Sequence, residues 1–143
     1  MLEITRRIIA DIDPQIIFYY SPAEKEFALK AHERLGHDPH IFTNIETKDI
    51  RELAMLLKNC DMFFGNEGGP RHLAQAVPSF IVQRPNLDIK EWIVEDERHQ
   101  GVGPLDVDPD AYSKYSAKEQ EDLVMPDLVV ERFEEFYNKC IKR

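Results

Sequence analysis

Short apolar runs alternate with helix-like segments between residues 15 and 83, and this alternation limits the fold more than any other feature of the sequence. The runs are rich in β-branched and aromatic residues, as buried strands are, and they read IIFYY, HIFTN, DMFFG and SFIVQ. The segments between them carry apolar residues at helical spacing. Strands that alternate with helices predict right-handed β-α-β units. We therefore expect an α/β fold with a Rossmann-like, mainly parallel sheet and flanking helices.

The ends of several helices can also be predicted. Residues 1–13 carry isoleucines near helical spacing and predict an amphipathic helix. In the next helix, Ser21 and Glu24 match a capping box, Pro22 suits the first turn, and Gly36 suits the C-terminal stop. A doubly wound sheet normally begins with a strand. Because this chain begins with a helix, we expect either that it is truncated or that its first strand has been lost.

The length of the chain predicts a single domain over residues 1–143. Residues 85–126 contain prolines and little apolar periodicity, so we expect them to be rich in loops. Residues 127–143 carry an apolar stripe at helical spacing and predict a C-terminal helix.

Composition excludes several classes of function. The chain has 27 acidic against 18 basic side chains and a formal net charge of -9. Such a surface argues against nucleic acid as a partner, because phosphate binding needs clustered Lys and Arg. Two cysteines at no metal-ligand spacing indicate buried thiols in a reducing compartment. No apolar run is long enough for a membrane span, so we expect a cytoplasmic protein.

A glycine-rich turn follows the third predicted strand and reads GNEGGPRHLAQA, residues 65–76. Ligands of open α/β sheets bind at this position, beyond the carboxyl end of a strand. We expect the amide groups of Gly69, Arg71 and His72 to point out of the helix start and to attract a phosphate. Pro70 suits the first position of that helix, because its missing N–H would have no partner in the helix. The alternative is that Gly-Gly-Pro is a sharp turn with no ligand.

Other candidate sites are less convincing. The segment DVDPD lacks the glycine and glutamate of a calcium-binding loop and is typical of a solvated acidic loop. His37 and His40 lack a third metal ligand nearby. Cys60 would need a base to act as a nucleophile, and the sequence identifies none. We therefore expect neither a metal nor a cofactor.

The segment CDMFFGNEGGPRHLAQAVPSFIV resembles the donor-site signature of glycosyltransferase family 9, the ADP-heptose:lipopolysaccharide heptosyltransferases. Members of that family have a strand, then N-D-[ST]-G-P-x-H-[LI]-A-x-A, then another strand. The resemblance extends over roughly residues 1–85. It implies the C-terminal, nucleotide-sugar-binding half of a GT-B glycosyltransferase, with the first strand of that half missing.

The resemblance also implies roles for individual residues. Gly69 and His72 would lie against the diphosphate of the donor, and Glu67 would lie near the donor sugar or ribose. Glu24 would lie near the nucleoside, although its capping box already explains it. The remaining residues of the donor-binding loop would be Asn66, Gly68 and Arg71. A catalytic residue stays unknown, because the general base of such enzymes belongs to the acceptor domain.

The implied function is transfer of a sugar from a nucleotide-diphosphate donor, an ADP-sugar first of all, to a cell-envelope glycan or lipid-linked acceptor during lipopolysaccharide biosynthesis. The acceptor would bind through a missing N-terminal domain, and the full-length protein would be cytoplasmic or peripheral to the inner membrane. The chain alone should bind without catalysing. Glu67 in place of Asp, Gly68 in place of Ser or Thr, and a short loop at Val77 depart from the signature. The alternative is a non-catalytic Rossmann-like binding or interaction module.

A missing first strand would leave two strand edges exposed inside the sheet, which is an aggregation hazard. We expect either that the strands in residues 16–20 and 61–65 pair directly, or that a partner chain covers their edges. A second copy of the chain, in a homo-oligomer, is one such partner.

Overall fold

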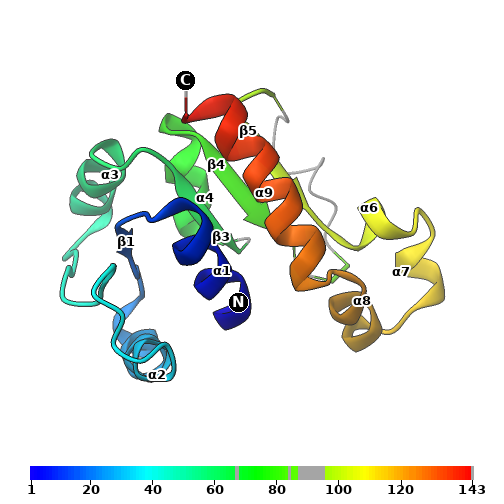
Figure 1. Ribbon diagram of the computed structural model, residues 1–143, viewed down its shortest axis with the longest axis horizontal. Coiled ribbons are helices and arrows are strands. Elements are labelled where there is room, and N and C mark those ends of the chain that lie inside the picture. The colour runs from blue at the N-terminus through cyan, green and yellow to red at the C-terminus, as the bar shows by residue number, and fades with distance from the viewer. Residues whose placement is uncertain (67, 84, 87–95, 143) are drawn as a thin grey trace. The chain divides into compact units, whose positions relative to one another are not determined.

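The computed structural model describes residues 1–66, 68–83, 85–86 and 96–142, and these residues form two compact units, Met1–Asp49 and Ile50–Arg143. Figure 1 shows the elements of both units. The architecture is mixed α/β with parallel strands and flanking helices, as the sequence predicts. Each unit contains its own sheet. That the two units together form one domain stays a prediction.

The Met1–Asp49 unit contains two helices and a two-stranded parallel sheet. Its strands pair in the register Ile16 with Ile41 and Ile17 with Phe42. β1 covers only Ile16–Ile17 of the predicted IIFYY strand, so the strand is shorter than expected. The elements in chain order are α1 (Leu2–Ile12), β1 (Ile16–Ile17), the 3-10 turn η1 (Pro22–Glu24), α2 (Lys25–Arg34) and β2 (Ile41–Phe42).

The predicted helix ends of this unit are confirmed. The backbone N–H and the hydroxyl of Ser21 donate to the Glu24 carboxylate over 3.1 and 2.6 Å, which is the acidic half of a capping box. Gly36 follows α2 with a φ of 73°, in the left-handed region that glycine adopts without strain. Its N–H donates to the carbonyl of Glu33 over 2.9 Å and closes the last turn.

The Ile50–Arg143 unit is built on a three-stranded parallel sheet in the order β3-β4-β5. Asn66 pairs with Val82, and Val82 pairs with Val102, so the carboxyl ends of all three strands share one edge. The elements are α3 (Ile50–Lys58), β3 (Phe63–Asn66), α4 (Gly69–Leu73), the 3-10 turn η2 (Ala74–Ala76), β4 (Ser79–Val82), β5 (His99–Val102), α6 (Pro104–Val107), α7 (Ala111–Lys114), α8 (Ala117–Leu123) and α9 (Pro126–Cys140).

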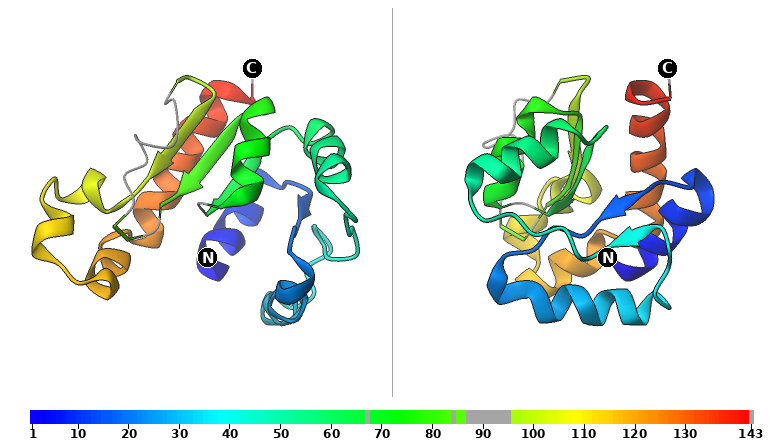
Figure 2. Two further views of the ribbon diagram at one scale, coloured as in Figure 1. Left: turned by 180° about the vertical axis from the view of Figure 1, so that it is seen from behind. Right: turned by 90° about the vertical axis from the view of Figure 1, so that its left-hand side faces the viewer.

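Helices pack against both faces of this sheet, as Figure 2 shows. On one face the ring of Phe80 lies 5.6 Å from the ring of Phe133 and 5.7 Å from that of Phe136, both on α9. On the other face Ile81 packs with Phe63, which also contacts a cluster from α3, α4 and the following turn. That cluster consists of Leu53, Leu57, Ala74 and Val77. The sheet is therefore the middle layer of the unit and carries most of its core.

One expectation about the fold is corrected, and another stays a prediction. Inside their own units β1 pairs with β2 and β3 pairs with β4, and direct pairing between the strands in residues 16–20 and 61–65 stays a prediction. Covering of strand edges by a partner chain stays a prediction. Residues 85–126 contain β5 and the short helices α6 to α8 where loops were expected. The sequence HQGV has little apolar character, and its pairing with the apolar β4 makes it a strand.

Within the described residues, no helix combines the length and the apolar character that crossing a membrane requires.

Candidate functional site

The glycine-rich turn lies at the carboxyl edge of the three-stranded sheet. β3 ends at the exposed Asn66, and α4 begins at Gly69. Parallel strands put their ligand-binding loops at this edge. The sequence therefore predicted the position of the turn correctly. Glu67, which the resemblance places near the donor sugar, lies outside the described residues.

Among the described residues, neither the backbone conformation nor the packing requires a glycine at position 68 or 69 of the turn. Gly68 is extended, with φ 162° and ψ 179°, a conformation that any residue adopts. A Cβ at Gly68 would lie 3.9 Å from Cδ of Pro70, which is an ordinary contact. A Cβ at Gly69 would have no described atom within 4 Å. Steric crowding among the described residues therefore does not explain these glycines, and a sharp turn without a ligand and the close approach of a ligand stay the two interpretations.

The amide groups of the turn are only partly available to a ligand. The N–H of Arg71 donates to the carbonyl of Gly68 over 3.2 Å, so the expectation that it points outward is wrong. The helix that follows is short, because α4 spans only Gly69–Leu73 before the 3-10 turn. A short helix adds little dipole behind the turn. An anion here would depend on the remaining amide groups and on side chains.

The two basic side chains of α4 are placed differently. Arg71 is only 1% exposed and is engaged in an interaction within the protein. A buried guanidinium of this kind stabilises the fold around it more readily than it reaches a ligand in solvent. His72, the next residue of the same helix, is exposed and is also engaged in an interaction within the protein. Of the two, His72 is therefore better placed to meet a ligand at the turn.

Glu24 belongs to the Met1–Asp49 unit, where its carboxylate accepts hydrogen bonds from Ser21. The turn belongs to the other unit. The contact of Glu24 with a nucleoside stays a prediction. The capping box accounts for this glutamate by itself.

The sequence did not predict the polar residues that follow β4 and β5 at the same edge. Gln83 is buried, and its side-chain N–H donates to the hydroxyl of Tyr112 over 2.9 Å. A Cβ at Gly103 would lie 2.8 Å from Cβ of Gln83, closer than real Cβ contacts. The N–H of Gly103 donates to the carboxylate of Asp106 over 2.7 Å. The Gly-Pro at residues 103–104 is the signal that could have revealed this close packing.

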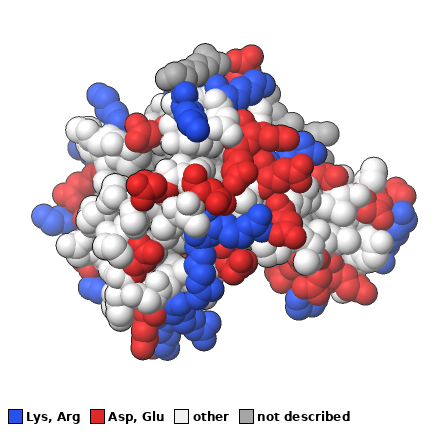
Figure 3. Space-filling view, in the orientation of Figure 1, with Lys and Arg blue, Asp and Glu red and all other residues white. Residues whose placement is uncertain are grey.

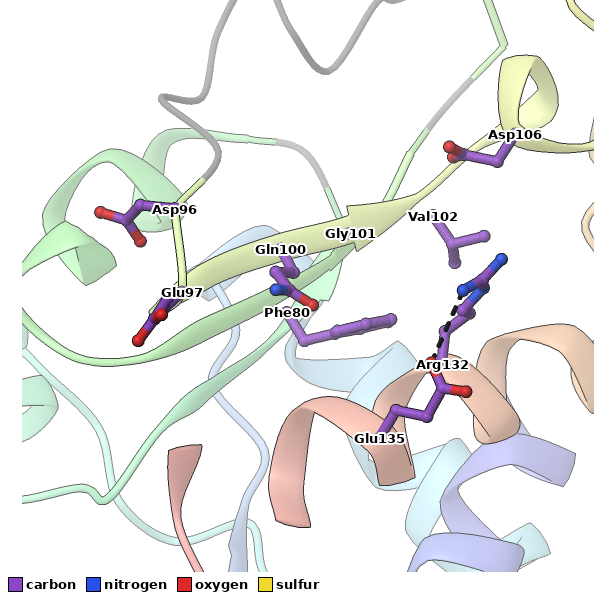
Figure 4. Close-up of a pocket in the computed structure, with 9 residues that line it drawn as sticks. All are labelled: Phe80, Asp96, Glu97, Gln100, Gly101, Val102, Asp106, Arg132 and Glu135. Carbon is purple, nitrogen blue, oxygen red and sulfur yellow. Dashed lines mark ion pairs between the residues drawn. The ribbon is translucent and has the colours of Figure 1, made fainter. Parts of the chain in front are cut away.

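A cavity of about 450 Å³ lies elsewhere in the same unit, between β5 and α9, and Figure 4 shows its lining. Its apolar part includes Phe80 and Val102, and none of the sequence-predicted site residues lines it. Arg132 forms an ion pair with Glu135 across 3.5 Å. The remaining charged lining residues are Asp96, Glu97 and Asp106. An excess of carboxylates repels a diphosphate, so this cavity does not replace the turn as a phosphate site.

Acidic side chains gather over α9 on the face drawn in Figure 3.

The loop between α6 and α7 contains two carboxylates that contact a lysine of α7. The ammonium of Lys114 lies 3.2 Å from the Asp108 carboxylate and 3.0 Å from that of Asp110. A side-chain cation therefore neutralises these two carboxylates. This arrangement agrees with the interpretation of DVDPD as a solvated acidic loop.

Cys60 precedes β3 and does not have the features of a nucleophile. Burial raises the pKa of its thiol, and the nearby charge of Asp61 raises it further. The reactive thiolate is therefore disfavoured at neutral pH.

Comparisons with known proteins add no relative. No family model matches the chain, no curated protein matches it, and no solved structure matches it.

Proposed function

We propose that this chain is a donor-binding domain for a nucleotide-diphosphate sugar, an ADP-sugar first of all, in a glycosyltransferase resembling the heptosyltransferases of glycosyltransferase family 9. One observation carries the proposal: Gly68 and Gly69 lie at the carboxyl edge of a parallel sheet, and the backbone and packing of the described residues require neither of them. Bare backbone at such a place suits the close approach of phosphate oxygens.

In this proposal the turn holds the leaving group of the transfer reaction. The backbone at Gly69 and the side chain of His72 contact the diphosphate, and Asn66 lies at the mouth of the turn. Glu67 contacts the sugar or ribose. Fixed donors stabilise the negative charge that develops on a departing diphosphate. The general base that deprotonates the acceptor hydroxyl comes from an acceptor domain outside this chain. The chain alone therefore binds the donor and does not catalyse.

The second candidate is a non-catalytic binding or interaction module. The internal hydrogen bond of the Arg71 amide and the burial of the Arg71 side chain favour it, because each removes one positive group from the proposed site. The buried Gln83 and the crowded Gly103 at the same edge stabilise the fold and do not require a ligand.

Calorimetric titration of the chain with ADP, an ADP-sugar and a UDP-sugar tests the proposal, with Gly69→Ala as the decisive variant. A Cβ at Gly69 meets no described atom, and its φ is not in the left-handed region, so the variant should fold and melt at the same temperature or slightly higher. The same Cβ stands where the phosphate would approach. We expect the variant to bind the ADP-sugar at least about tenfold more weakly, which corresponds to about 1.4 kcal/mol.

The other outcomes are equally informative. Absence of binding by the wild-type chain at millimolar nucleotide concentrations would reject the donor-binding function and leave the non-catalytic module. Binding that Gly69→Ala leaves unchanged would place the ligand away from the turn. A His72→Gln variant tests the side-chain contact separately, because it keeps a donor but removes the imidazole.

A further inference from the structure

His40, in the Met1–Asp49 unit, lies between two carboxylates. Its Nε2 lies 2.8 Å from Oδ1 of Asp13, the residue that follows α1. Its Nδ1 lies 2.8 Å from Oδ1 of Asp38, in the loop between α2 and β2. The backbone N–H of His40 donates to the same Asp38 oxygen over 2.9 Å. The ring thus links the end of one helix to the loop that follows another.

The backbone of His40 extends this link to the sheet. Its carbonyl accepts the N–H of Ile16 over 2.7 Å, next to the register pair Ile16–Ile41. The loop itself is shaped for the contact, because His37 adopts a left-handed conformation with φ 54° and the N–H of Ile41 donates to the carbonyl of Asp38 over 3.0 Å. One residue therefore connects the end of α1, the α2–β2 loop and β1.

The geometry indicates which form of the ring satisfies both contacts. A neutral imidazole has an N–H on one ring nitrogen and a lone pair on the other. The nitrogen that carries the lone pair would face a carboxylate oxygen, which is also an acceptor, so that contact would have no hydrogen bond. The doubly protonated imidazolium donates to both carboxylates. Charge-assisted hydrogen bonds of this type are the stronger ones.

We propose that His40 is a proton-sensitive clasp that fastens the end of α1 to the α2–β2 loop and so holds the Met1–Asp49 unit together while the imidazole is protonated. Loss of the proton removes one of the two hydrogen bonds and the attraction to both carboxylates. The end of α1 then becomes more mobile, and the backbone hydrogen bond from Ile16 of β1 to the carbonyl of His40 opens more often.

The groups that face the ring set the pH range of the clasp. Hydrogen bonding to Asp38 raises the pKa of His40 above its ordinary value of 6.5, and Asp13 adds to the increase, while desolvation opposes it. The hydrogen bonds from the His40 backbone and ring lower the pKa of Asp38 below 3.8, and the nearby His32 of α2 acts in the same direction. β1 contributes only the apolar Ile16 and Ile17.

The sign of the effect follows from these directions. A raised histidine pKa gives stability that is complete below pH 6.5 and is lost as the pH rises through the raised value. A lowered aspartate pKa gives stability that is complete above pH 3.8 and is lost as the pH falls through the lowered value. The clasp is therefore complete between these two limits and opens on the alkaline side.

NMR on the intact chain tests the clasp directly. Long-range proton–nitrogen spectra at pH 5.5 should show both ring nitrogens of His40 protonated. Amide exchange of Ile16, corrected for the intrinsic effect of pH, should accelerate by about two- to fivefold between pH 5.5 and 8.5, the size expected for partly exposed ion pairs. His40→Gln should remove this extra pH dependence.

His37→Asn is the matched control, because Asn also tolerates the left-handed conformation of this residue. The ring that this substitution removes packs edge-on against His32, with the two ring centroids 5.1 Å apart. The His37→Asn variant should keep the pH dependence. If His40→Gln unfolds the unit, Asp13→Asn replaces it, because that side chain is 83% exposed, and it should lower the pKa of His40. A His40 ring that carries one proton at pH 5.5, or a pH dependence that survives in His40→Gln, would overturn the proposal.

Discussion

Gly69 and Gly103 both lie where a strand has ended and a helix begins, but the structure gives them opposite properties. At Gly103 the backbone is extended, with φ -147°, and the packing leaves no room for a Cβ beside Gln83. At Gly69 the described residues leave that room. Packing therefore requires a glycine at position 103, whereas packing among the described residues does not require one at position 69.

The contrast predicts a difference in stability between two matched substitutions. Gly103→Ala should lower the free energy of unfolding by about 1–3 kcal/mol, the usual cost of overpacking a well-filled site. Gly69→Ala should leave it unchanged or raise it slightly. Urea unfolding of the two variants measures both values under the same conditions. Equal losses in the two variants would contradict the assignment of different roles to these glycines.

Sequence reasoning located the candidate site but could not resolve its details. The pattern of apolar strand, glycines, proline and histidine was enough to place the turn at the carboxyl edge of a strand. It could not show that the Arg71 amide bonds to Gly68, because this local bond depends on where α4 begins. Nor could it show that the Arg71 side chain is buried, because that depends on packing by elements remote in sequence. Gln83 and Tyr112 were missed for the same reason, since they are 29 residues apart in the sequence.

At the scale of elements, α9 is the main cover of one face of the three-stranded sheet. Its buried residues are Val129, Val130, Phe133 and Phe136, and the two phenylalanine rings pack against Phe80 of β4. This contact fixes which face of the sheet α9 covers. Phe136 is fully buried, so its side chain reports on the attachment of the whole helix.

Phe136→Ala should lower the free energy of unfolding of the Ile50–Arg143 unit by about 3–5 kcal/mol, because it removes a large buried ring and leaves a cavity. Glu131→Ala, on the exposed side of the same helix, is the control and should change it by less than about 0.5 kcal/mol. Thermal or urea unfolding followed by near-ultraviolet circular dichroism measures both. A small effect of Phe136→Ala would mean that α9 is not part of the core.

The elements that sequence patterns predicted best are those with their own strong signals. The capping box of Ser21 and Glu24 and the left-handed Gly36 mark their helix ends locally, so they were found. β5 has no such signal, because HQGV becomes a strand only by pairing with β4. The partners of β1 and β3 inside their own units, β2 and β4, are set by tertiary packing and not by local sequence.

At the scale of the whole molecule, buried residues are distributed unevenly between the two compact units. Among the described residues, the buried apolar side chains of Met1–Asp49 are Ile4, Ile8 and Ile41. In α2 no described residue is buried, and Phe27 on that helix is 75% exposed. The other buried apolar side chains of the described residues belong to the Ile50–Arg143 unit. This unit also contains the packed rings of Phe80, Phe133 and Phe136. Local stability follows the number of buried apolar contacts.

We therefore predict that amide exchange of the intact chain separates the two units. Amides of β3 and β4 should be protected close to the level set by global unfolding, whereas amides of α2 should exchange at least about tenfold faster, equivalent to 1.4 kcal/mol or more of local opening. Mass spectrometry of peptides after deuterium exchange at pH 6 measures both in one sample, at a pH where the His40 clasp is closed. Raising the pH to 8.5 should widen the difference, because only the Met1–Asp49 unit depends on that imidazolium. Equal protection of α2 and β4 at both pH values would contradict this prediction, because it would show that the two units open together. The small core around Ile4 and Ile8 would then not limit the local stability of the Met1–Asp49 unit.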